Sequence, residues 1–212
     1  YDYIAITDHS QRAMASRTLA RDDVLRQREE IQSVRSFVRG IEVLHGVEVD
    51  ILLDGTLDFP DELLEGFDVV LASLHDAGED GGQALTERYL RAIEHPLVNL
   101  ITHPANRTPA FSQGYDLDFD KLFEAAARTG TAMEVDGAPG HLDLDGALAR
   151  RAAASGVTLV IDSDCHRAEA LDRQMRFGVA TARRGWVEPQ HVLNTRSVDA
   201  VREFVANKRA RR

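Results

Sequence analysis

The sequence contains one cysteine, Cys165, in 212 residues, so the chain can form no internal disulfide bond. Such sparse use of cysteine is typical of a reducing cytoplasm. No segment approaches 18 uninterrupted apolar residues, and no signal-peptide pattern is present. The sequence therefore predicts a cytoplasmic protein without a membrane span.

Basic residues are in the minority as well. The chain has 25 lysines and arginines against 35 aspartates and glutamates, a formal net charge of −10 and a sequence pI near 5.2. This balance argues against a domain that grips nucleic acid by bulk positive charge. It leaves open a catalytic domain whose acidic groups hold cations. A glycine-rich dinucleotide fingerprint and a Walker loop are also absent.

The chain does contain a regular alternation of strand and helix. With 43% hydrophobic residues it can bury one sizeable core, so we expect a single domain over residues 1–212. Short apolar stretches predict six strands, at residues 4–7, 43–52, 68–74, 98–102, 131–136 and 157–161. Helical patterns follow near residues 19–38, 84–93, 118–128, 145–155, 168–183 and 197–208. This order predicts a parallel sheet covered by helices.

The two ends of the chain lead to separate expectations. Residue 1 is a tyrosine and residues 3–7 already have the pattern of a core strand, so we expect a fragment of a longer polypeptide. The basic segment 207–212 is expected to be a frayed, solvated terminus, which we favour over a contact with nucleic acid.

The strand at 157–161 stops abruptly in the sequence Asp162-Ser163-Asp164-Cys165-His166. An Asp-x-His pair at the end of a strand suits a metal ion, because both side chains extend the same way from a fixed backbone. The alternative is an aspartate that caps the next helix beside a surface histidine. Polar residues end all the predicted strands, which favours a barrel over an open sheet, since the active site of a (β/α) barrel is assembled from those ends.

Six ligand-type residues lie on or after the predicted strands: His9, Glu48, His75, His103, Asp164 and His166. Each histidine taken alone could be structural, but five strand ends with such residues favour a multinuclear metal site. A nitrogen and oxygen ligand set of this kind suits Zn²⁺, Mn²⁺ or Fe²⁺. Two or three such cations would polarise a phosphoryl oxygen, activate water and neutralise a leaving oxygen, which are the needs of phosphoester hydrolysis.

Two further residues are candidates for catalysis. Glu134 ends the fifth predicted strand and could hydrogen-bond a ligand or a bound water, although a structural acid is an equal interpretation. Arg107 follows His103 closely and could clamp a substrate phosphate, with a surface loop arginine as the alternative. Asp8 could orient an imidazole or cap a turn.

Residues outside these sets are interpreted as non-functional. Four histidines lie off the strand ends, and we expect all of them at the surface: His45, His95, His141 and His191. Arg183 and Arg184 are expected to be solvated or structural rather than in contact with DNA.

Five short motifs of the sequence resemble those of the PHP (polymerase and histidinol phosphatase) domain family. The motifs are Thr7-Asp8-His9, Gly46-Val47-Glu48, Ser73-Leu74-His75, Thr102-His103-Pro104 and Ser163-Asp164-Cys165-His166, which span nearly the whole chain. The segments 128–135, 150–153 and 181–186 look like the C-terminal PHP domain of bacterial family X DNA polymerases. The segment ending in Trp186 is the most specific, because it matches without containing any metal ligand.

The resemblance implies a distorted (β/α)7 barrel of the PHP fold that holds up to three metal ions and, in these polymerases, a Mn²⁺-dependent 3′–5′ exonuclease. By motif, Glu48 would bridge two metals, with Asp164 on one and His75 and His103 on the other. His9 and His166 would hold the third.

This sequence departs from the family pattern in three places. The opening His-x-His strand and a further histidine shortly after it are absent, so we expect the first strand upstream of Tyr1 and a fragment that can be inactive alone. Cys165 replaces an alanine between Asp164 and His166. Asp136 and His141 stand where an asparagine and a basic residue are expected.

The sequence therefore predicts a metal-dependent phosphodiesterase, the 3′–5′ exonuclease domain of a family X DNA polymerase acting in DNA repair. Its catalytic residues would be Glu48, Asp164, Glu134 and Arg107, and its cofactors two or three Mn²⁺ or Zn²⁺ ions. We expect a monomer that meets DNA 3′ ends through an upstream polymerase domain. The alternatives are a small-molecule phosphomonoesterase of histidinol-phosphatase type, and a decayed PHP module that only braces a polymerase.

Overall fold

The computed structural model describes residues 1–13, 15 and 17–211. Its strands are β1 (Tyr3–Ser10), β2 (Thr18–Leu19), β3 (Glu42–Asp50), β4 (Val69–Ser73), β5 (Leu100–Ile101), β6 (Ala132–Asp136) and β7 (Leu159–Asp162). Its α-helices are α1 (Arg21–Phe37), α2 (Asp61–Leu64), α3 (Gly82–Glu94), α4 (Phe119–Thr129), α5 (Gly146–Ala154), α6 (Leu171–Arg184) and α7 (Val198–Arg209). Three 3₁₀ turns lie at 168–170, 189–191 and 193–195.

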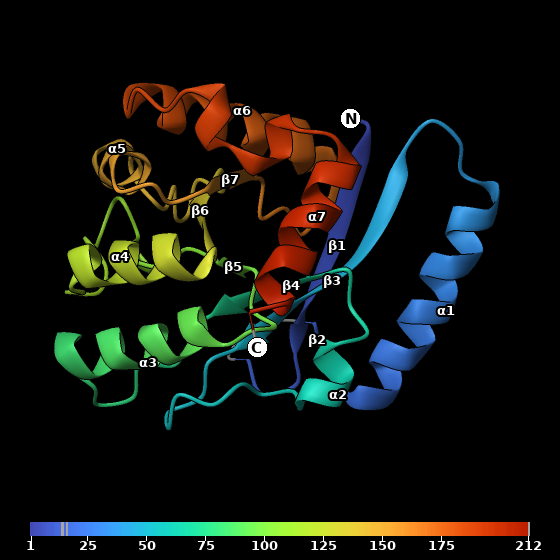
Figure 1. Cartoon of the computed structure of the whole chain (residues 1–212), viewed down its shortest axis with the longest axis horizontal. Helices are drawn as coiled ribbons and strands as arrows, with labels where there is room; N and C mark the ends of the chain where they lie inside the picture. Colours follow the sequence, from blue (N-terminus) through green and yellow to red (C-terminus); the bar gives the residue numbers. More distant parts are fainter. Residues whose placement is uncertain (14, 16, 212) are drawn as a thin grey trace.

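The seven strands form one all-parallel sheet in the order β2-β1-β3-β4-β5-β6-β7. The sheet curls into a half-barrel. Helices α3, α4, α5 and α6 follow one another around its outside, and α1 lies on the opposite side of the molecule, beyond β1 and β3 (Figure 1). The predicted α/β, distorted TIM-like barrel architecture is therefore confirmed. The sequence predicted six strands, because β2 has only two residues and pairs only with the last two of β1.

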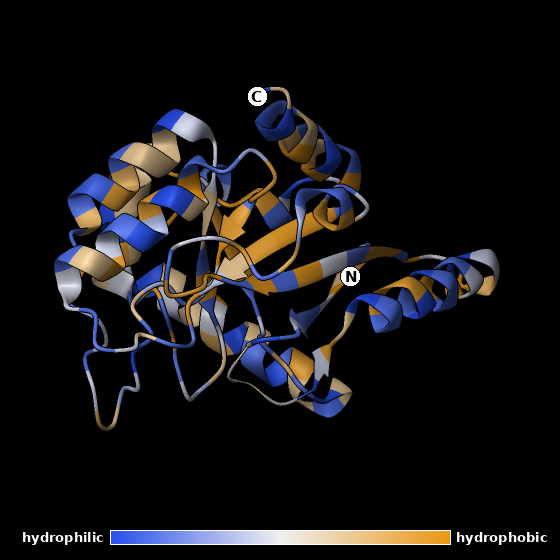
Figure 2. Cartoon of the chain, turned by 90° about the horizontal axis from the view of Figure 1, so that it is seen from below, coloured by the Kyte–Doolittle hydropathy of each residue, from blue (hydrophilic) through white to orange (hydrophobic). Residues whose placement is uncertain are grey.

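The main core lies between the convex side of the sheet and the helices. Its strand residues are apolar and almost fully buried, and it includes Val47, Val70, Ile101, Met133 and Val135. Figure 2 shows the apolar colour on the strands and on the inner sides of the helices. Burial of this apolar surface is the dominant favourable term that fixes the helices on the sheet.

The concave side of the sheet is covered differently. Here α7 packs its apolar side chains against the strands, with Val201 beside Leu44, and Phe204 beside Leu71 and Leu100. The segment 207–212 was expected to be frayed, but α7 continues to Arg209, and within it Lys208 is buried and its Nζ donates to the carbonyl oxygen of Ile93 at 2.7 Å. Arg212 lies outside the described residues.

Close strand spacing near the site depends on a glycine. A Cβ at Gly46 would lie 2.7 Å from Cγ2 of Thr7 and 2.9 Å from Cγ1 of Val69. Because such distances are too short for real Cβ contacts, a side chain here would force Thr7 on β1 and Val69 on β4 to shift. Gly46 thus keeps the strand before Glu48 in its place.

The helices begin and end as the sequence chemistry predicts. Asp118 and Asp145 accept hydrogen bonds from the first turns of α4 and α5, and Ser197 does the same for α7. Gly130 closes α4 with a φ of +74°, in the left-handed region that favours glycine. In the described part of the chain, no helix combines the length and the apolar character that crossing a membrane requires.

Candidate functional site

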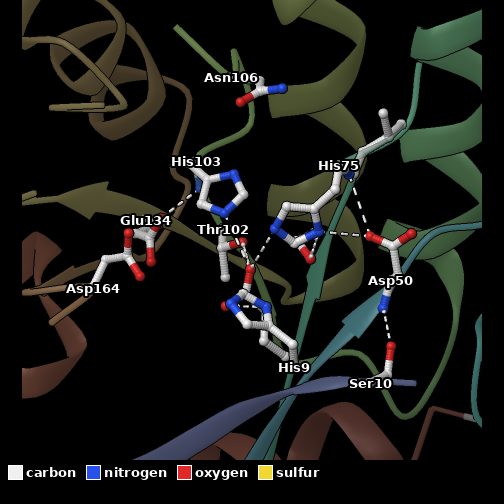
Figure 3. Close-up of polar contacts among 12 residues, drawn as sticks. His9, Ser10, Asp50, His75, Thr102, His103, Asn106, Glu134 and Asp164 are labelled. Carbon is white, nitrogen blue, oxygen red and sulfur yellow. Dashed lines mark hydrogen bonds and ion pairs between the residues drawn. The ribbon is translucent and has the colours of Figure 1, made fainter. Parts of the chain in front are cut away.

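The carboxyl ends of the parallel strands meet at one edge of the half-barrel, and six predicted ligand residues gather there: His9 in β1, Glu48 in β3, His75 after β4, His103 after β5, and Asp164 and His166 after β7. The ring centroids of His9 and His75 are 5.1 Å apart, and those of His9 and His166 are 5.8 Å apart. Figure 3 shows the imidazoles of His9, His75 and His103 turned toward one another. The structure thus brings the six predicted residues together, and their roles as ligands remain a prediction.

Glu48 lies at the centre of this group and is 5% exposed. Its Oε1 is 3.1 Å from Nε2 of His103 and 3.5 Å from Nε2 of His75, and its Oε2 is 3.5 Å from Nδ1 of His9. Burial acts to raise the pKa of the Glu48 carboxyl, but the hydrogen bond from His103 and the three imidazoles outweigh burial and lower this pKa to about 2. Glu48 therefore stays ionised in a buried position.

His103 is the imidazole most tightly tied to Glu48. Burial acts to lower the pKa of His103, but the hydrogen bond and the charge of Glu48 raise it to about 9. Thr102 adds a longer hydrogen bond, 3.3 Å from its Oγ1 to Oε1 of Glu48. The buried pair therefore holds a proton that a cation binding to His103 would have to displace.

The orientation of His75 is set by Asp50, which is 2% exposed. Oδ1 of Asp50 lies 2.7 Å from Nδ1 of His75, and the backbone N–H of Asp50 donates to Oγ of Ser10 at 2.9 Å. With Nδ1 held by Asp50, Nε2 of His75 faces Glu48. In metal sites a carboxylate often orients a ligand imidazole in the same way. Sequence reasoning missed this role of Asp50, because the contact joins the ends of two different strands.

Glu134 also acts on a neighbouring residue. Its Oε2 accepts a hydrogen bond from the backbone N–H of His103, whose φ of +25° is unusual for a residue other than glycine. Burial, followed by the charges of Asp162 and Asp136, raises the pKa of Glu134 well above its usual range. Burial and the neighbouring carboxylates therefore favour the protonated form of Glu134, and its hydrogen bond holds the His103 main chain in an uncommon conformation.

Three more carboxyls crowd around Glu134. Burial first, and neighbouring carboxylates next, raise the pKa of Asp136 to about 8. Burial likewise raises the pKa of Asp162 to about 6, and that of Asp164 above its usual value. Among the described residues, Oδ2 of Asp136 and Oδ1 of Asp162 are buried without a hydrogen-bond partner. Such a cluster gains from a nearby positive charge, which would let these acids ionise.

The donor set fits a divalent cation. Single ligand atoms from His9, Glu48 and His75 all lie within 4.8 Å of one another, so these residues could hold a metal ion. In the described part of the chain, Nδ1 of His9 and Nδ1 of His103 are buried without a hydrogen-bond partner. Mixed imidazole and carboxylate ligands suit Zn²⁺ and Mn²⁺.

Arg107 and Asp8 lie beside the group rather than within it. The guanidinium of Arg107 is 3.5 Å from Oδ2 of Asp145 and 3.4 Å from the carbonyl oxygen of Leu142. Asp8 accepts a hydrogen bond from Gln27 of α1, so it lies on the helix-facing side of β1. Alternation along the strand accounts for this, since His9 points the other way.

Two histidines expected at the surface are not there. His45 is 3% exposed and packs against the ring of Phe67, because α1 and its Gln27 cover this side of β3. His141 is half-buried, and its ring stacks on that of His103 with centroids 5.1 Å apart. The loop after β6 brings His141 to the site, which a residue so far from a strand end did not signal.

A cavity of about 530 Å³ opens at this group and runs down the concave side of the sheet. Near the group it is lined by His9, Glu48, His103, Asp164, His166 and Arg167. Deeper down it is lined by apolar side chains of β1, β7 and α7, among them Ile4, Val160 and Phe204. The imidazoles and carboxylates of the site therefore line the polar end of this cavity.

The chain is similar to proteins of two descriptions. It is 40% identical over 205 residues to the DNA polymerase/3′-5′ exonuclease PolX of Bacillus subtilis, which covers 97% of this chain and 36% of the relative. It is 31% identical over 183 residues to a probable phosphatase of Shewanella sp. strain MR-4, covering 81% of this chain and 68% of that relative. A probable phosphatase of Thermoanaerobacter sp. strain X514 is 29% identical over 182 residues, covering 81% and 71%. No protein-family model matches the chain.

Proposed function

The chain belongs to the PHP (polymerase and histidinol phosphatase) domain family, and from this premise we propose that it is a metal-dependent 3′–5′ exonuclease acting on DNA. It is a phosphoesterase domain of this family. It spans 36% of the polymerase relative, so the polymerase context belongs to the proposal. We propose that residues 1–212 form one domain of a longer family X DNA polymerase, which acts in DNA repair in the cytoplasm.

The observation that carries the proposal is the ring of imidazoles around Glu48. Three histidines from three strand ends lie with a side-chain nitrogen within 3.5 Å of its carboxylate oxygens. This is a preorganised site for two or three Mn²⁺ or Zn²⁺ ions, held by His9, Glu48, His75, His103, Asp164 and His166. Bound there, the cations would supply Lewis acidity for the attack of water on phosphorus and would neutralise charge on the departing 3′ oxygen.

The residues of the chain prepare the site for this chemistry. Asp50 holds the ring of His75, and Glu134 holds the main chain of His103, so both imidazoles are fixed before substrate arrives. Asp164 faces the polar end of the cavity, where it would meet the phosphate. Arg107 shares a long contact with Asp145, and we propose that it turns from there to clamp a non-bridging phosphate oxygen.

The remaining parts of the proposal concern the assembly. The sheet does not close on itself: β7 forms one edge, and β2 forms the other together with the part of β1 before His9. We propose that one further strand from the longer polypeptide pairs with this free part of β1. The domain would act as a monomer and receive DNA 3′ ends from the polymerase part of that polypeptide.

A second candidate is hydrolysis of a small phosphomonoester. It is favoured by the two probable phosphatases, which match 81% of this chain. It uses the same residues, so the substrate must decide between the two.

The test is an assay of the chain as printed, and of the full-length polypeptide that contains it, with a 5′-labelled single-stranded oligonucleotide and Mn²⁺. A product ladder that shortens from the 3′ end, and that is lost in Asp164→Ala, is the expected result. The variant should keep the circular dichroism spectrum and the unfolding midpoint of the parent chain. An intact oligonucleotide beside phosphate released from p-nitrophenyl phosphate would overturn the exonuclease in favour of the phosphomonoesterase. Inactivity on both the oligonucleotide and p-nitrophenyl phosphate would favour the third alternative, a decayed PHP module that only braces a polymerase.

A further inference from the structure

The outer side of α6 carries arginines and a phenylalanine on one exposed stripe: Arg173, Arg176, Phe177, Arg183 and Arg184. Positions three, four, seven and eleven residues apart share a side of an α-helix, and these five residues fall within about a third of its circumference. The stripe is about 17 Å long at 1.5 Å per residue. Figure 1 shows α6 as an outer element of the fold, with its inner side toward α5 and the sheet.

The charge of this α6 stripe contrasts with that of the chain, whose formal net charge is −10. In the described part of the chain, no carboxylate pairs with the guanidinium of Arg173, Arg183 or Arg184. Arg176 pairs with Asp172 at 2.9 Å, but both side chains are more than two-thirds exposed, so the pair contributes little. The stripe is therefore a local positive surface on an acidic domain, which is complementary to a polyanion.

Aromatic side chains accompany the arginines. Phe177 is 40% exposed midway along the stripe, and Trp186 is 79% exposed just beyond the end of α6. Proteins that bind single-stranded nucleic acid combine exposed aromatic side chains with arginines, because bases stack on the rings and phosphates contact the guanidinium groups.

The first turns of α6 lie beside the candidate site. His166 lies five residues before α6, and the cavity at the site is lined by Arg167 and by Leu171 and Met175 of the first turns of the helix. Leu171 and Met175 are on the inner side of α6, opposite the stripe, so a chain of nucleotides that leaves the cavity must pass around the start of α6, where it meets Arg173 and Arg176 first and Arg183 and Arg184 last.

We propose that the α6 stripe binds the single strand on the 5′ side of the nucleotide being removed. The arginines would contact successive phosphates, and Phe177 would stack on a base. The inference rests on the proposed exonuclease function and gives it a substrate class, namely single-stranded DNA several nucleotides long.

Binding without cleavage tests the stripe on its own. Fluorescence anisotropy of a labelled 20-nucleotide oligothymidine is measured in EDTA with the printed chain, with the double variant Arg173→Glu/Arg184→Glu, and with Phe177→Ala. The matched control, Arg21→Glu/Arg39→Glu, reverses two exposed arginines on and beside α1, which lies apart from α6 in Figure 1. We expect Kd to rise at least tenfold in the double variant and at least fivefold in Phe177→Ala, with the control unchanged.

The slope of log Kd against log salt should fall by about 1.4 in the double variant, at about 0.7 for each lost phosphate contact.

If the stripe variants and the control variant bound the oligonucleotide with equal affinity, the proposal would be overturned. The stripe would then be a candidate surface for an acidic protein partner. Absence of binding by the parent chain would overturn it as well. An exonuclease assay separates this outcome from failure of the proposed function. The double variant should raise KM for the 20-mer and leave hydrolysis of thymidine 5′-p-nitrophenyl phosphate unchanged. A parent chain that binds the oligonucleotide through the stripe without degrading it would refute the exonuclease and keep the stripe.

Discussion

Oδ1 of Asp50 lies 2.7 Å from Nδ1 of His75, and this contact joins the end of β3 to the residue after β4. It exists because the parallel register places Asp50 beside Ser73, two residues before His75. A buried carboxylate in this position fixes the ring and raises the basicity of the opposite nitrogen. The quality of the proposed metal site therefore depends on a residue that would touch no metal.

Asp50→Asn tests that dependence. The amide keeps the shape of the side chain but removes its charge, so the affinity for Mn²⁺ should fall roughly 10- to 100-fold. Isothermal titration calorimetry measures the affinity, and Asp54→Asn, in an exposed turn, is the matched control. Equal affinities of the two variants would show that Asp50 is merely a structural acid.

Glu134 allows the positioning and acid–base roles to be separated. Burial and nearby carboxylates raise the pKa of Glu134 and so favour its neutral form, which glutamine resembles, and the amide oxygen of Glu134→Gln should still accept the hydrogen bond from the backbone N–H of His103. We expect this variant to keep its stability and most of its hydrolytic rate. Glu134→Ala leaves that buried N–H unpaired and should cost about 1–3 kcal/mol in the free energy of unfolding, measured in urea. A glutamine variant that is stable but inactive would instead assign Glu134 a proton-transfer role.

The candidate ligand residues could be predicted from the sequence because the carboxyl ends of parallel strands lie on the same side of a sheet. Locating the ends of the strands was therefore enough to bring His9, Glu48 and His75 together. The remaining site contacts could not. The pairing of Asp50 with His75 depends on strand register, and the stacking of His141 on His103 depends on the path of a loop. The burial of His45 depends on α1 lying over β3, which a strand pattern alone does not reveal.

Metal binding should release protons. In the metal-free protein Glu48 raises the pKa of His103 to about 9, whereas a metal ligand must be a neutral imidazole. Between pH 6.5 and 9 a proton must therefore leave His103, so the apparent affinity for Mn²⁺ should rise with pH up to about 9. Glu48 contributes no proton in this range, since its pKa is about 2.

Calorimetry in two buffers with different ionisation enthalpies counts these protons. At pH 7.5 the parent chain should release about one more proton per site than His103→Asn. The control, His191→Gln, alters a histidine near the 3₁₀ turns and should match the parent. A proton count that does not differ between the parent and His103→Asn would contradict the assigned protonation of His103.

The last prediction concerns Lys208, whose Nζ is buried beneath the sheet against the carbonyl oxygen of Ile93. Burial, followed by the charge of Arg211, lowers the pKa of Lys208 to about 8 from an ordinary value of 10.5. Between pH 8 and 10.5 the unfolded chain therefore binds more protons than the folded one, so this group makes the folded state more stable as pH rises. Below pH 8 both states are protonated, and the cost of burying the charge is constant.

Urea unfolding of the parent chain and of Lys208→Met at pH 7, 8, 9 and 10 checks this directly. The difference in unfolding free energy between the two should be flat below pH 8. Above pH 8 it should move in favour of the parent, by less than about 1.4 kcal/mol per pH unit. Subtracting the variant removes the contribution of tyrosines that ionise in the same range. A difference that stays flat to pH 10 would mean that the ammonium group is hydrated in the folded chain and that its burial does not lower the pKa of Lys208.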